Sequence, residues 1–157
     1  MNIEIERKFL VKNESFKNES FKKIYIKQGY LNTDKDRTVR VRIANDQGFI
    51  TIKGASSKKG LSRFEWEKEI STIEAASLLL LSETRIIEKN RYLVQNEDFT
   101  FEVDEFLGDN KGLLLAEIEL NSENDKFKRT TWLGKEVTGN VKYYNSYLSK
   151  NPFKNWI

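Results

Sequence analysis

The sequence predicts an α+β fold in which eight antiparallel strands close into a β-barrel, with a charged interior and a few helices packed outside. Apolar and charged residues alternate with a period of two along most of the chain, which is typical of strands whose successive side chains face opposite sides. Short polar turns such as Asn45-Asp46-Gln47-Gly48 separate these segments and favour antiparallel hairpins. About eight strands are enough to close a sheet into a small barrel.

The alternating segments predict strands near residues 2–11, 24–32, 37–44, 48–53, 62–70, 85–94, 99–107 and 113–121. Helical signals are fewer. The capping box Ser71-Thr72-Ile73-Glu74 predicts a helix that continues to Leu81. Further helices are predicted at residues 14–22, 123–129 and 142–149, and Pro152 helps to end the last of them. Strands therefore form the majority of the predicted elements.

The composition limits the chemistry that the protein can perform. The chain has 157 residues with 27 Lys and Arg, 24 Asp and Glu, and neither His nor Cys, so its formal net charge is +3. The missing His and Cys exclude thiolate or imidazole zinc sites, disulfides, cysteine proteases and Ser-His-Asp triads. Any reaction must therefore use carboxylates, amines, guanidinium groups, hydroxyls or a metal held by oxygen.

No repeat, low-complexity block or linker divides the sequence, which predicts a single domain over residues 1–157. The N-terminal residues alternate charged and apolar side chains, unlike a secretory signal. The longest aliphatic run, Leu78 to Leu81, is far shorter than the ~20 residues that cross a bilayer. We expect a soluble, cytoplasmic protein with no membrane partner. The small charge excess gives no reason to expect a nucleic-acid partner.

The charged faces of the predicted strands separate by sign. Acidic side chains lie on the first, fifth, seventh and eighth strands, and they are Glu4, Glu6, Glu65, Glu67, Glu102, Asp104, Glu117 and Glu119. Basic side chains lie on the third, fourth and sixth strands, and they are Arg40, Arg42, Lys53, Lys89 and Arg91. A solvated sheet face is the ordinary cause of alternation, but such a face usually mixes both signs. If the apolar faces point outward under the helices, these charges line a tunnel.

Such a tunnel suits a polyanion whose oxygens lie in series, because Arg grips phosphate in a bidentate manner and Lys adds a point charge. The neighbouring carboxylates would repel that anion unless a divalent cation lay between them. Since only oxygen ligands are available, Mg²⁺ or Mn²⁺ is the expected ion. The pattern therefore favours hydrolysis of a phosphoanhydride by a water that attacks in line.

The segment Glu4-Ile5-Glu6-Arg7-Lys8 resembles the ExExK signature of the CYTH superfamily, also called triphosphate tunnel metalloenzymes. One such motif would be weak evidence, because short charged alternations are common. The resemblance extends in order along almost the whole chain, through Gln28-Gly29-Tyr30, Arg40-Val41-Arg42, Thr51-Ile52-Lys53, Arg63-Phe64-Glu65-Trp66-Glu67, Glu88-Lys89-Asn90-Arg91-Tyr92, Asp104, Glu117-Ile118-Glu119, and Trp132 to Thr138. Among members, the chain looks most like the short bacterial inorganic triphosphatases.

The resemblance implies an eight-stranded tunnel that binds a triphosphate together with a divalent metal. It assigns Glu4, Glu6, Asp104, Glu117 and Glu119 to the metal side. It assigns Lys8, Arg40, Arg42, Lys53, Lys89 and Arg91 to the phosphates. Either Glu65 or Glu67 would position the attacking water, and Lys8 near Tyr30 would protonate or stabilise the leaving phosphate. One departure is Lys142, where relatives usually carry an Arg before the Tyr, so a bidentate contact is lost there.

Metal-dependent hydrolysis of inorganic tripolyphosphate is the activity that the resemblance favours, with a small polyphosphate as the partner. A class IV adenylyl cyclase, which makes cyclic AMP and pyrophosphate from ATP, would use the same kind of tunnel. Thiamine and nucleoside triphosphates are further substrates to consider. A polyphosphate-binding module without turnover is the non-enzymatic alternative, although both acidic pairs are intact. The resemblance also implies a homodimer.

Overall fold

Nine strands make up the sheet in the computed structural model, which describes residues 2–156. Each of the eight predicted strands is present, and their bounds are β1 (Ile3–Val11), β2 (Lys22–Asn32), β3 (Arg37–Ala44), β4 (Gln47–Gly54), β5 (Ser62–Ile70), β6 (Ile87–Asn96), β7 (Phe99–Phe106) and β8 (Leu114–Glu119). A short ninth strand, β9 (Leu133–Glu136), was not predicted, because four residues that include Gly134 carry too little alternation to be recognised.

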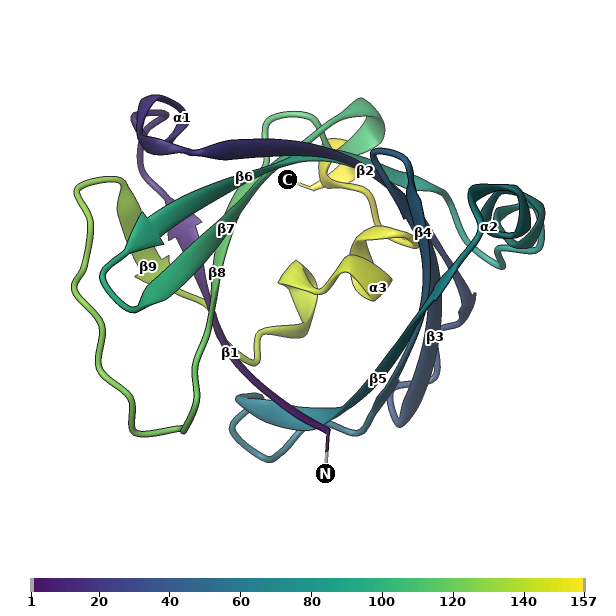
Figure 1. Ribbon diagram of the computed structural model, residues 1–157, viewed down its shortest axis with the longest axis horizontal. Coiled ribbons are helices and arrows are strands. Elements are labelled where there is room, and N and C mark those ends of the chain that lie inside the picture. The colour runs from purple at the N-terminus through teal and green to yellow at the C-terminus, as the bar shows by residue number, and fades with distance from the viewer. Residues whose placement is uncertain (1, 157) are drawn as a thin grey trace.

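The sheet closes because β1 pairs along both of its edges. The strand order is β5-β4-β3-β2-β6-β7-β8-β1-β9, and β5 pairs with β1 as well. On one edge, residues 6–10 of β1 pair antiparallel with β8. On the other edge, residues 3–5 pair with β5, while Phe9 and Val11 pair with β9. The predicted eight-stranded antiparallel barrel is thus confirmed, and Figure 1 looks along it.

Helices are few and short, namely α1 (Phe16–Glu19), α2 (Thr72–Leu79) and α3 (Asn145–Leu148). The 3₁₀ turns are η1 (Gly108–Asn110), η2 (Val141–Tyr143) and η3 (Phe153–Asn155). The capping box of α2 is confirmed, since the Ser71 side chain accepts a hydrogen bond from the Glu74 amide and Glu74 accepts one from the Ser71 amide. The α2 helix packs outside β3 and β4, where Gly48 leaves room for Ala75, 2.9 Å from the place a Cβ would occupy.

Two helix predictions need correction. Residues 123–129 form no helix, because the Asp125 carboxylate accepts hydrogen bonds from the Asn121 and Ser122 amides and so closes a turn, after which Phe127 packs edge-on against Phe9 and Phe101. The helix predicted at residues 14–22 is reduced to α1, since β2 already begins at Lys22. Local sequence favoured a helix in both places, but tertiary packing determined the outcome.

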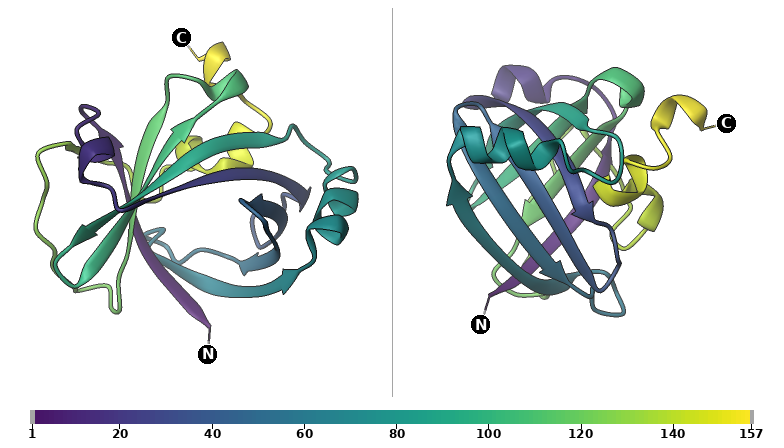
Figure 2. Two further views of the ribbon diagram at one scale, coloured as in Figure 1. Left: turned by 45° about the horizontal axis from the view of Figure 1, so that its top comes forward. Right: turned by 90° about the vertical axis from the view of Figure 1, so that its right-hand side faces the viewer.

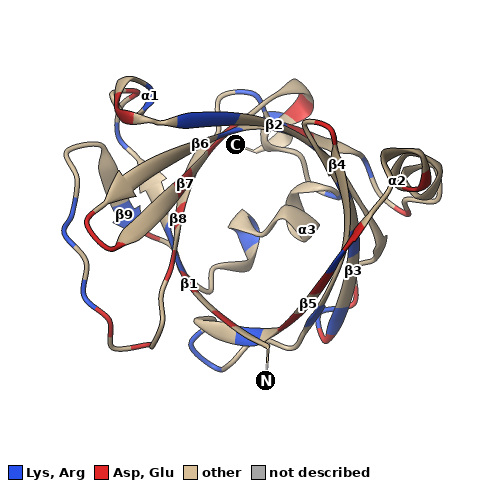
Figure 3. Ribbon diagram, viewed as in Figure 1, with Lys and Arg blue, Asp and Glu red and all other residues tan. Residues whose placement is uncertain are grey.

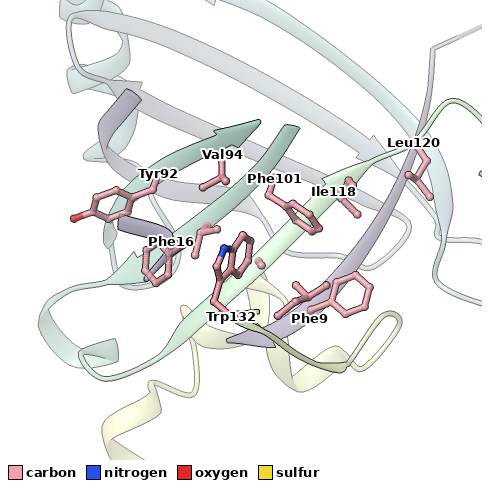
Figure 4. Packing of buried hydrophobic residues seen from close by; sticks show 11 residues of the cluster. Phe9, Phe16, Tyr92, Val94, Phe101, Ile118, Leu120 and Trp132 are labelled. Carbon is pink, nitrogen blue, oxygen red and sulfur yellow. The ribbon is translucent and has the colours of Figure 1, made fainter. Parts of the chain in front are cut away.

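The main apolar core lies outside the barrel wall. Trp132 packs edge-on against both Phe16 and Phe101 there, and Phe9 and Ile118 belong to the same cluster (Figure 4). Tyr92 and Phe101 are both buried in this cluster. Phe64 and Trp66 also lie on an apolar face, but they remain 42% and 38% exposed because no helix covers β5. A core outside the wall leaves the interior to the charged side chains.

The C-terminal segment, residues 139–150, differs in position from the other helical parts. In the view along the barrel α3 lies across the opening, whereas α1 and α2 lie outside the wall (Figures 1 and 2). This segment therefore covers one end of the barrel and refines the prediction that the helices pack outside. Among the described residues, no helix is long and apolar enough to span a membrane.

Candidate active site

A polar cavity of about 220 Å³ runs inside the barrel. It is lined by every residue proposed from the sequence for substrate, metal or catalysis except Asp104. Those lining residues are Glu4, Glu6, Lys8, Tyr30, Arg40, Arg42, Lys53, Glu65, Glu67, Lys89, Arg91, Glu117 and Glu119. Arg63 and Glu102, two residues of the same strands that the resemblance left without a role, also reach the cavity, whereas Glu69 does not. The alternation of the strands thus delivers the predicted side chains to one place.

The two signs of charge occupy two sides of the barrel. Around the closed sheet, the acidic strands β7, β8, β1 and β5 are neighbours, and so are β4, β3, β2 and β6, which carry the remaining basic groups and Tyr30 (Figure 3). Lys8 on β1 and Arg63 on β5 are the exceptions on the acidic side. We call these sides the acidic wall and the basic wall. Strand order therefore produces the segregation that the sequence pattern predicted.

On the acidic wall, Glu4 is held by a cation from β4, the strand on the other side of β5. Lys53 Nζ donates to both Glu4 carboxylate oxygens, at 2.9 and 3.0 Å, and lies 3.4 Å from Glu65 Oε2. Burial opposes ionisation of Glu4, but Lys53 more than offsets it, so the pKa of Glu4 falls below its usual value. Burial and the nearby Glu4 carboxylate raise the pKa of Glu65. The pKa values of these neighbouring carboxyls are therefore shifted in opposite directions, down for Glu4 and up for Glu65.

Glu6 and Glu117 form a second pair on the same wall, hydrogen-bonded to each other from β1 and β8. Burial, followed by the charge of Glu117, raises the pKa of Glu6 well above its usual value. Burial would raise the pKa of Glu117 too, but Lys8 and Arg91, at 3.8 and 3.5 Å, hold it well below the usual range. Of the two carboxyls, Glu6 is therefore the one that binds a proton more readily.

On β3 of the basic wall, Arg40 and Arg42 are incompletely paired. Arg40 Nη2 donates to the Thr51 hydroxyl at 3.3 Å, and Arg42 Nη2 donates to Glu67 Oε2 at 3.5 Å. The Nε atoms of both arginines are buried and have no hydrogen-bond partner among the described residues. Burial and the neighbouring Arg40 and Arg91 lower the pKa of Arg42 to about 10. Buried cations that lack hydrogen-bond partners favour an incoming anion.

On β6, by contrast, Lys89 and Arg91 are paired with a carboxylate behind them. Arg91 donates from Nε and Nη2 to the two Asp104 oxygens at 2.8 and 2.9 Å, and Lys89 Nζ lies 2.8 Å from Asp104 Oδ2. Asp104 is only 1% exposed and does not line the cavity. The structure thus places Asp104 as the counter-ion of two phosphate-binding candidates, and does not bring it together with the other proposed metal ligands.

Lys8 and Tyr30 line the same cavity without contacting each other. Lys8 Nζ donates to the Tyr143 carbonyl at 3.0 Å and lies 5.2 Å from the centre of the Tyr144 ring. Within residues 2–156, the Tyr30 hydroxyl forms no hydrogen bond. Lys142 points elsewhere, with Nζ 4.3 Å above the Trp156 ring and outside the cavity lining. Lys142 therefore takes no part in lining the cavity.

The cavity lining also contains Tyr144, Asn145 and Ser146, which the sequence analysis missed. They come from the C-terminal segment that covers the end of the barrel. The argument from sequence relied on period-two alternation, which this segment lacks. The polar run Tyr143-Tyr144-Asn145 near the start of the helix predicted at residues 142–149 was the available signal.

The acidic wall suits a hard divalent cation by its chemistry, since its four proposed ligands, Glu4, Glu6, Glu117 and Glu119, offer only carboxylate oxygens. The raised pKa of Glu6 beside Glu117 shows that negative charge is crowded here, and a cation would relieve this repulsion. Among residues 2–156 no three such groups stand together as a finished metal cluster. Lys53 holds both oxygens of Glu4, so this ligand must exchange partners before it can bind a metal.

Comparison with known proteins gives a consistent result. The family model for the CYTH domain matches residues 2–150. An inorganic triphosphatase of Acetivibrio thermocellus is 52% identical, over 99% of each chain, and one of Nitrosomonas europaea is 37% identical, over 93% of this chain and 96% of its own. A crystal structure of an inorganic triphosphatase superposes with a TM-score of 0.66 at 33% identity, covering 92% of this chain and 96% of the other. The chain belongs to the CYTH domain family.

Proposed function

We propose that this protein hydrolyses inorganic triphosphate to pyrophosphate and phosphate inside the barrel, with the help of a divalent metal. The observation that carries the proposal is the cavity with an acidic and a basic wall, in a chain whose full-length relatives are inorganic triphosphatases. Those walls offer a place for a polyanion and a place for the cation that would accompany it. A small polyphosphate is thus the proposed partner.

The basic wall would hold the phosphate chain. Arg40 and Arg42 line the cavity and are incompletely paired, while Lys53, Lys89 and Arg91 supply further positive charge from β4 and β6. Lys53 is shared with Glu4 in this state. A phosphate oxygen that attracted Lys53 would release Glu4 for metal binding, so triphosphate and metal are expected to favour each other's binding.

On the opposite wall, Glu4, Glu6, Glu117 and Glu119 would hold the metal, for which Mg²⁺ or Mn²⁺ is the proposed choice. When bound there, such an ion would neutralise phosphate charge and polarise the phosphorus toward attack. A carboxylate ligates a cation in its ionised form, and the raised pKa of Glu6 makes protons stronger competitors for this ligand. Metal affinity should therefore fall at low pH.

Water would attack the terminal phosphorus, its oxygen forming the new P–O bond while the bridging P–O bond breaks and pyrophosphate leaves. Glu65 is the favoured residue to position this water and accept its proton, because it lies beside Glu4 and its pKa is raised. Glu67 is less suitable, since the Thr51 hydroxyl donates to it at 2.6 Å and Arg42 lies 3.5 Å away. Lys8 and Tyr30 remain the proposed groups that stabilise or protonate the leaving pyrophosphate.

The test is phosphate release from tripolyphosphate with Mg²⁺ or Mn²⁺, in the presence and absence of EDTA. We expect metal-dependent release by the wild type and its loss in Glu4→Gln, which keeps the shape of the side chain but not its charge. Glu69→Gln is the matched control, because Glu69 lies on a barrel strand outside the cavity lining. Equal release by Glu4→Gln and the wild type would refute the assignment, and cyclic AMP from ATP would favour a cyclase.

Three expectations from the sequence stay with this proposal. A cytoplasmic location suits a substrate made of soluble phosphates. A homodimer and the lack of a nucleic-acid partner are the other two. Size-exclusion chromatography with light scattering measures the oligomeric state directly.

A further inference from the structure

The C-terminal segment, residues 139–150, is fastened to the cavity from several sides. Lys8 Nζ donates to the Tyr143 carbonyl, and the Tyr144 ring lies between Lys8 and Arg63, whose cationic groups are 5.2 and 5.9 Å from its centre. Leu148, which is 1% exposed, anchors α3 in a small apolar cluster. The side chains next to these anchors are therefore held at fixed places in the cavity lining.

Asn145, the first residue of α3, makes the most informative contacts of this segment. Its Oδ1 accepts hydrogen bonds from Lys89 Nζ at 3.0 Å and from Gln28 Nε2 at 3.1 Å. Lys89 and Gln28 are both at least 99% buried. A lysine ammonium can only donate, so the atom that faces it must be the oxygen of the Asn145 amide. The orientation of this carboxamide is thus determined by its neighbours.

The amide nitrogen of Asn145 consequently points away from Lys89 and Gln28. Within the described part of the chain, Asn145 Nδ2 donates no hydrogen bond, yet Asn145 lines the cavity beside Lys89. Nδ2 is not buried either, so this donor without a partner is accessible from the cavity. An oriented N–H₂ group beside a phosphate-binding lysine is suited to donate to a phosphate oxygen.

We propose that Asn145 binds the triphosphate directly, donating from Nδ2 to a phosphate oxygen at the end of the tunnel that α3 covers. This inference rests on the proposed function and adds a binding residue to it. Because the donor is neutral, it recognises a phosphate oxygen without adding to the repulsion among the cations of the basic wall. The C-terminal segment is then part of the binding site as well as its cover.

The competing explanation is that Asn145 only braces Lys89, which itself binds phosphate. A double-mutant cycle separates the two, with tripolyphosphate titrated into the protein calorimetrically in EDTA so that no turnover occurs. Asn145→Ala should weaken binding about 10-fold, the usual effect of losing a hydrogen bond to a charged group. It should weaken binding to a similar extent in the Lys89→Met background, where there is no lysine left to brace. Asn151→Ala, at an exposed position just beyond the segment, serves as the control and should bind like the wild type.

Asn145→Asp gives a second test that does not depend on the alanine variant's folding. Its carboxylate can still accept from Lys89 and Gln28, so its melting temperature should be at least that of the wild type, but it has no N–H₂ to donate. Ser146→Asp adds the same charge to the cavity lining and is the matched comparison. Binding by Asn145→Asp should be weaker than binding by Ser146→Asp by about a further 10-fold.

The inference is overturned if Asn145→Ala binds tripolyphosphate within twofold of the wild type, if its effect vanishes in Lys89→Met, or if Asn145→Asp binds as well as Ser146→Asp. These results leave the proposed hydrolysis untouched, since wild-type phosphate release is measured separately. Conversely, a wild type that binds tripolyphosphate but releases no phosphate with metal would refute the hydrolysis and leave the role of Asn145 in binding intact. A wild type that neither binds tripolyphosphate in EDTA nor releases phosphate from it with metal would overturn both.

Discussion

The arginine pair on β3 and the Lys89–Arg91 pair on β6 face the same cavity but differ in how their charge is balanced. On β6, Asp104 lies within 3 Å of both cations and accepts two hydrogen bonds from Arg91. On β3, Arg40 and Arg42 share a single glutamate, Glu67, at 3.8 and 3.5 Å. One pair is completed by the protein itself, and the other is left to be completed by a ligand.

The pKa values of the two pairs express the same difference. Burial lowers the pKa of Arg91, but Asp104 and Glu102 more than offset this and raise it well above its usual value. Burial and two neighbouring arginines lower the pKa of Arg42 to about 10. Positive charge beside hydrogen-bond donors that lack partners destabilises the ligand-free protein, and the same charge stabilises the complex once phosphate binds. We infer that the basic pair on β3 serves ligand binding, whereas the pair on β6 also stabilises the barrel.

Removing Asp104 should cause the largest change in stability. Asp104→Ala leaves the buried Lys89 without its carboxylate partner and removes two hydrogen bonds from Arg91, and the loss of one partner from a buried ion pair typically costs about 3–5 kcal/mol. Urea unfolding of the metal-free, substrate-free protein measures it, with Arg42→Ala as the comparison on β3. The free energy of unfolding of Arg42→Ala should be at least that of the wild type, since the substitution relieves repulsion between Arg42 and the neighbouring arginines. Equal destabilisation by both variants would break the contrast between the pairs.

For substrate binding, by contrast, substitutions of the β3 arginines should have the large effect. Arg40→Ala and Arg42→Ala each remove charge-assisted hydrogen bonds to phosphate, typically about 1.5–3 kcal/mol, and should raise the KM for tripolyphosphate roughly 10- to 100-fold. Steady-state phosphate release gives KM and kcat for each variant. Arg85→Ala is a suitable control, because Arg85 pairs with Asp109 away from the cavity. A KM within threefold of the wild type in both variants would show that β3 does not bind substrate.

Lys89 provides a prediction about pH. Burial outweighs the attraction of Asp104 and lowers the pKa of Lys89 from 10.5 to about 8. Between these pH values the unfolded chain binds more protons at this residue than the folded protein does, so the contribution of Lys89 to stability rises with pH. Compared with Lys89→Met, the wild type should gain on the order of 1 kcal/mol from pH 8 to pH 10. A difference between the two unfolding curves that stays flat with pH would contradict the lowered pKa.

The smallest effect is expected at Lys142, a basic group outside both pairs. It contacts the Trp156 ring and does not line the cavity, so Lys142→Ala should cost roughly 0.5–1 kcal/mol of stability. Its KM for tripolyphosphate should remain that of the wild type. Thermal unfolding and phosphate release measure the two quantities, and a tenfold rise in KM would place Lys142 among the binding residues after all.

Most of the barrel and its lining could be predicted because both depend on local alternation. In β3, for example, Arg40 and Arg42 point inward for the same reason that Val41 between them is buried under α2. The separation into two walls could be predicted from the sign of charge on each strand. These features repeat every second residue and need no knowledge of distant contacts.

The parts that could not be predicted depend on contacts between distant segments. Asp104 shares the inward face of β7 with Glu102, yet its carboxylate is paired with Lys89 and Arg91 on β6 and does not line the cavity. Asn145 enters the cavity because the C-terminal segment folds back over the end of the barrel, 56 residues from Lys89. The alternation of residues along a strand predicts neither arrangement, because both depend on contacts between segments that are distant in the sequence.

The central claim, that β3 is completed by the substrate, is tested most directly by the melting temperature of the Arg40→Ala/Arg42→Ala double variant with and without tripolyphosphate, in EDTA. The wild type should melt several degrees higher with saturating tripolyphosphate, because a ligand that binds the folded state stabilises it. The double variant should melt no lower than the wild type without ligand and should lose this shift. A double variant that keeps the wild-type shift would contradict the account.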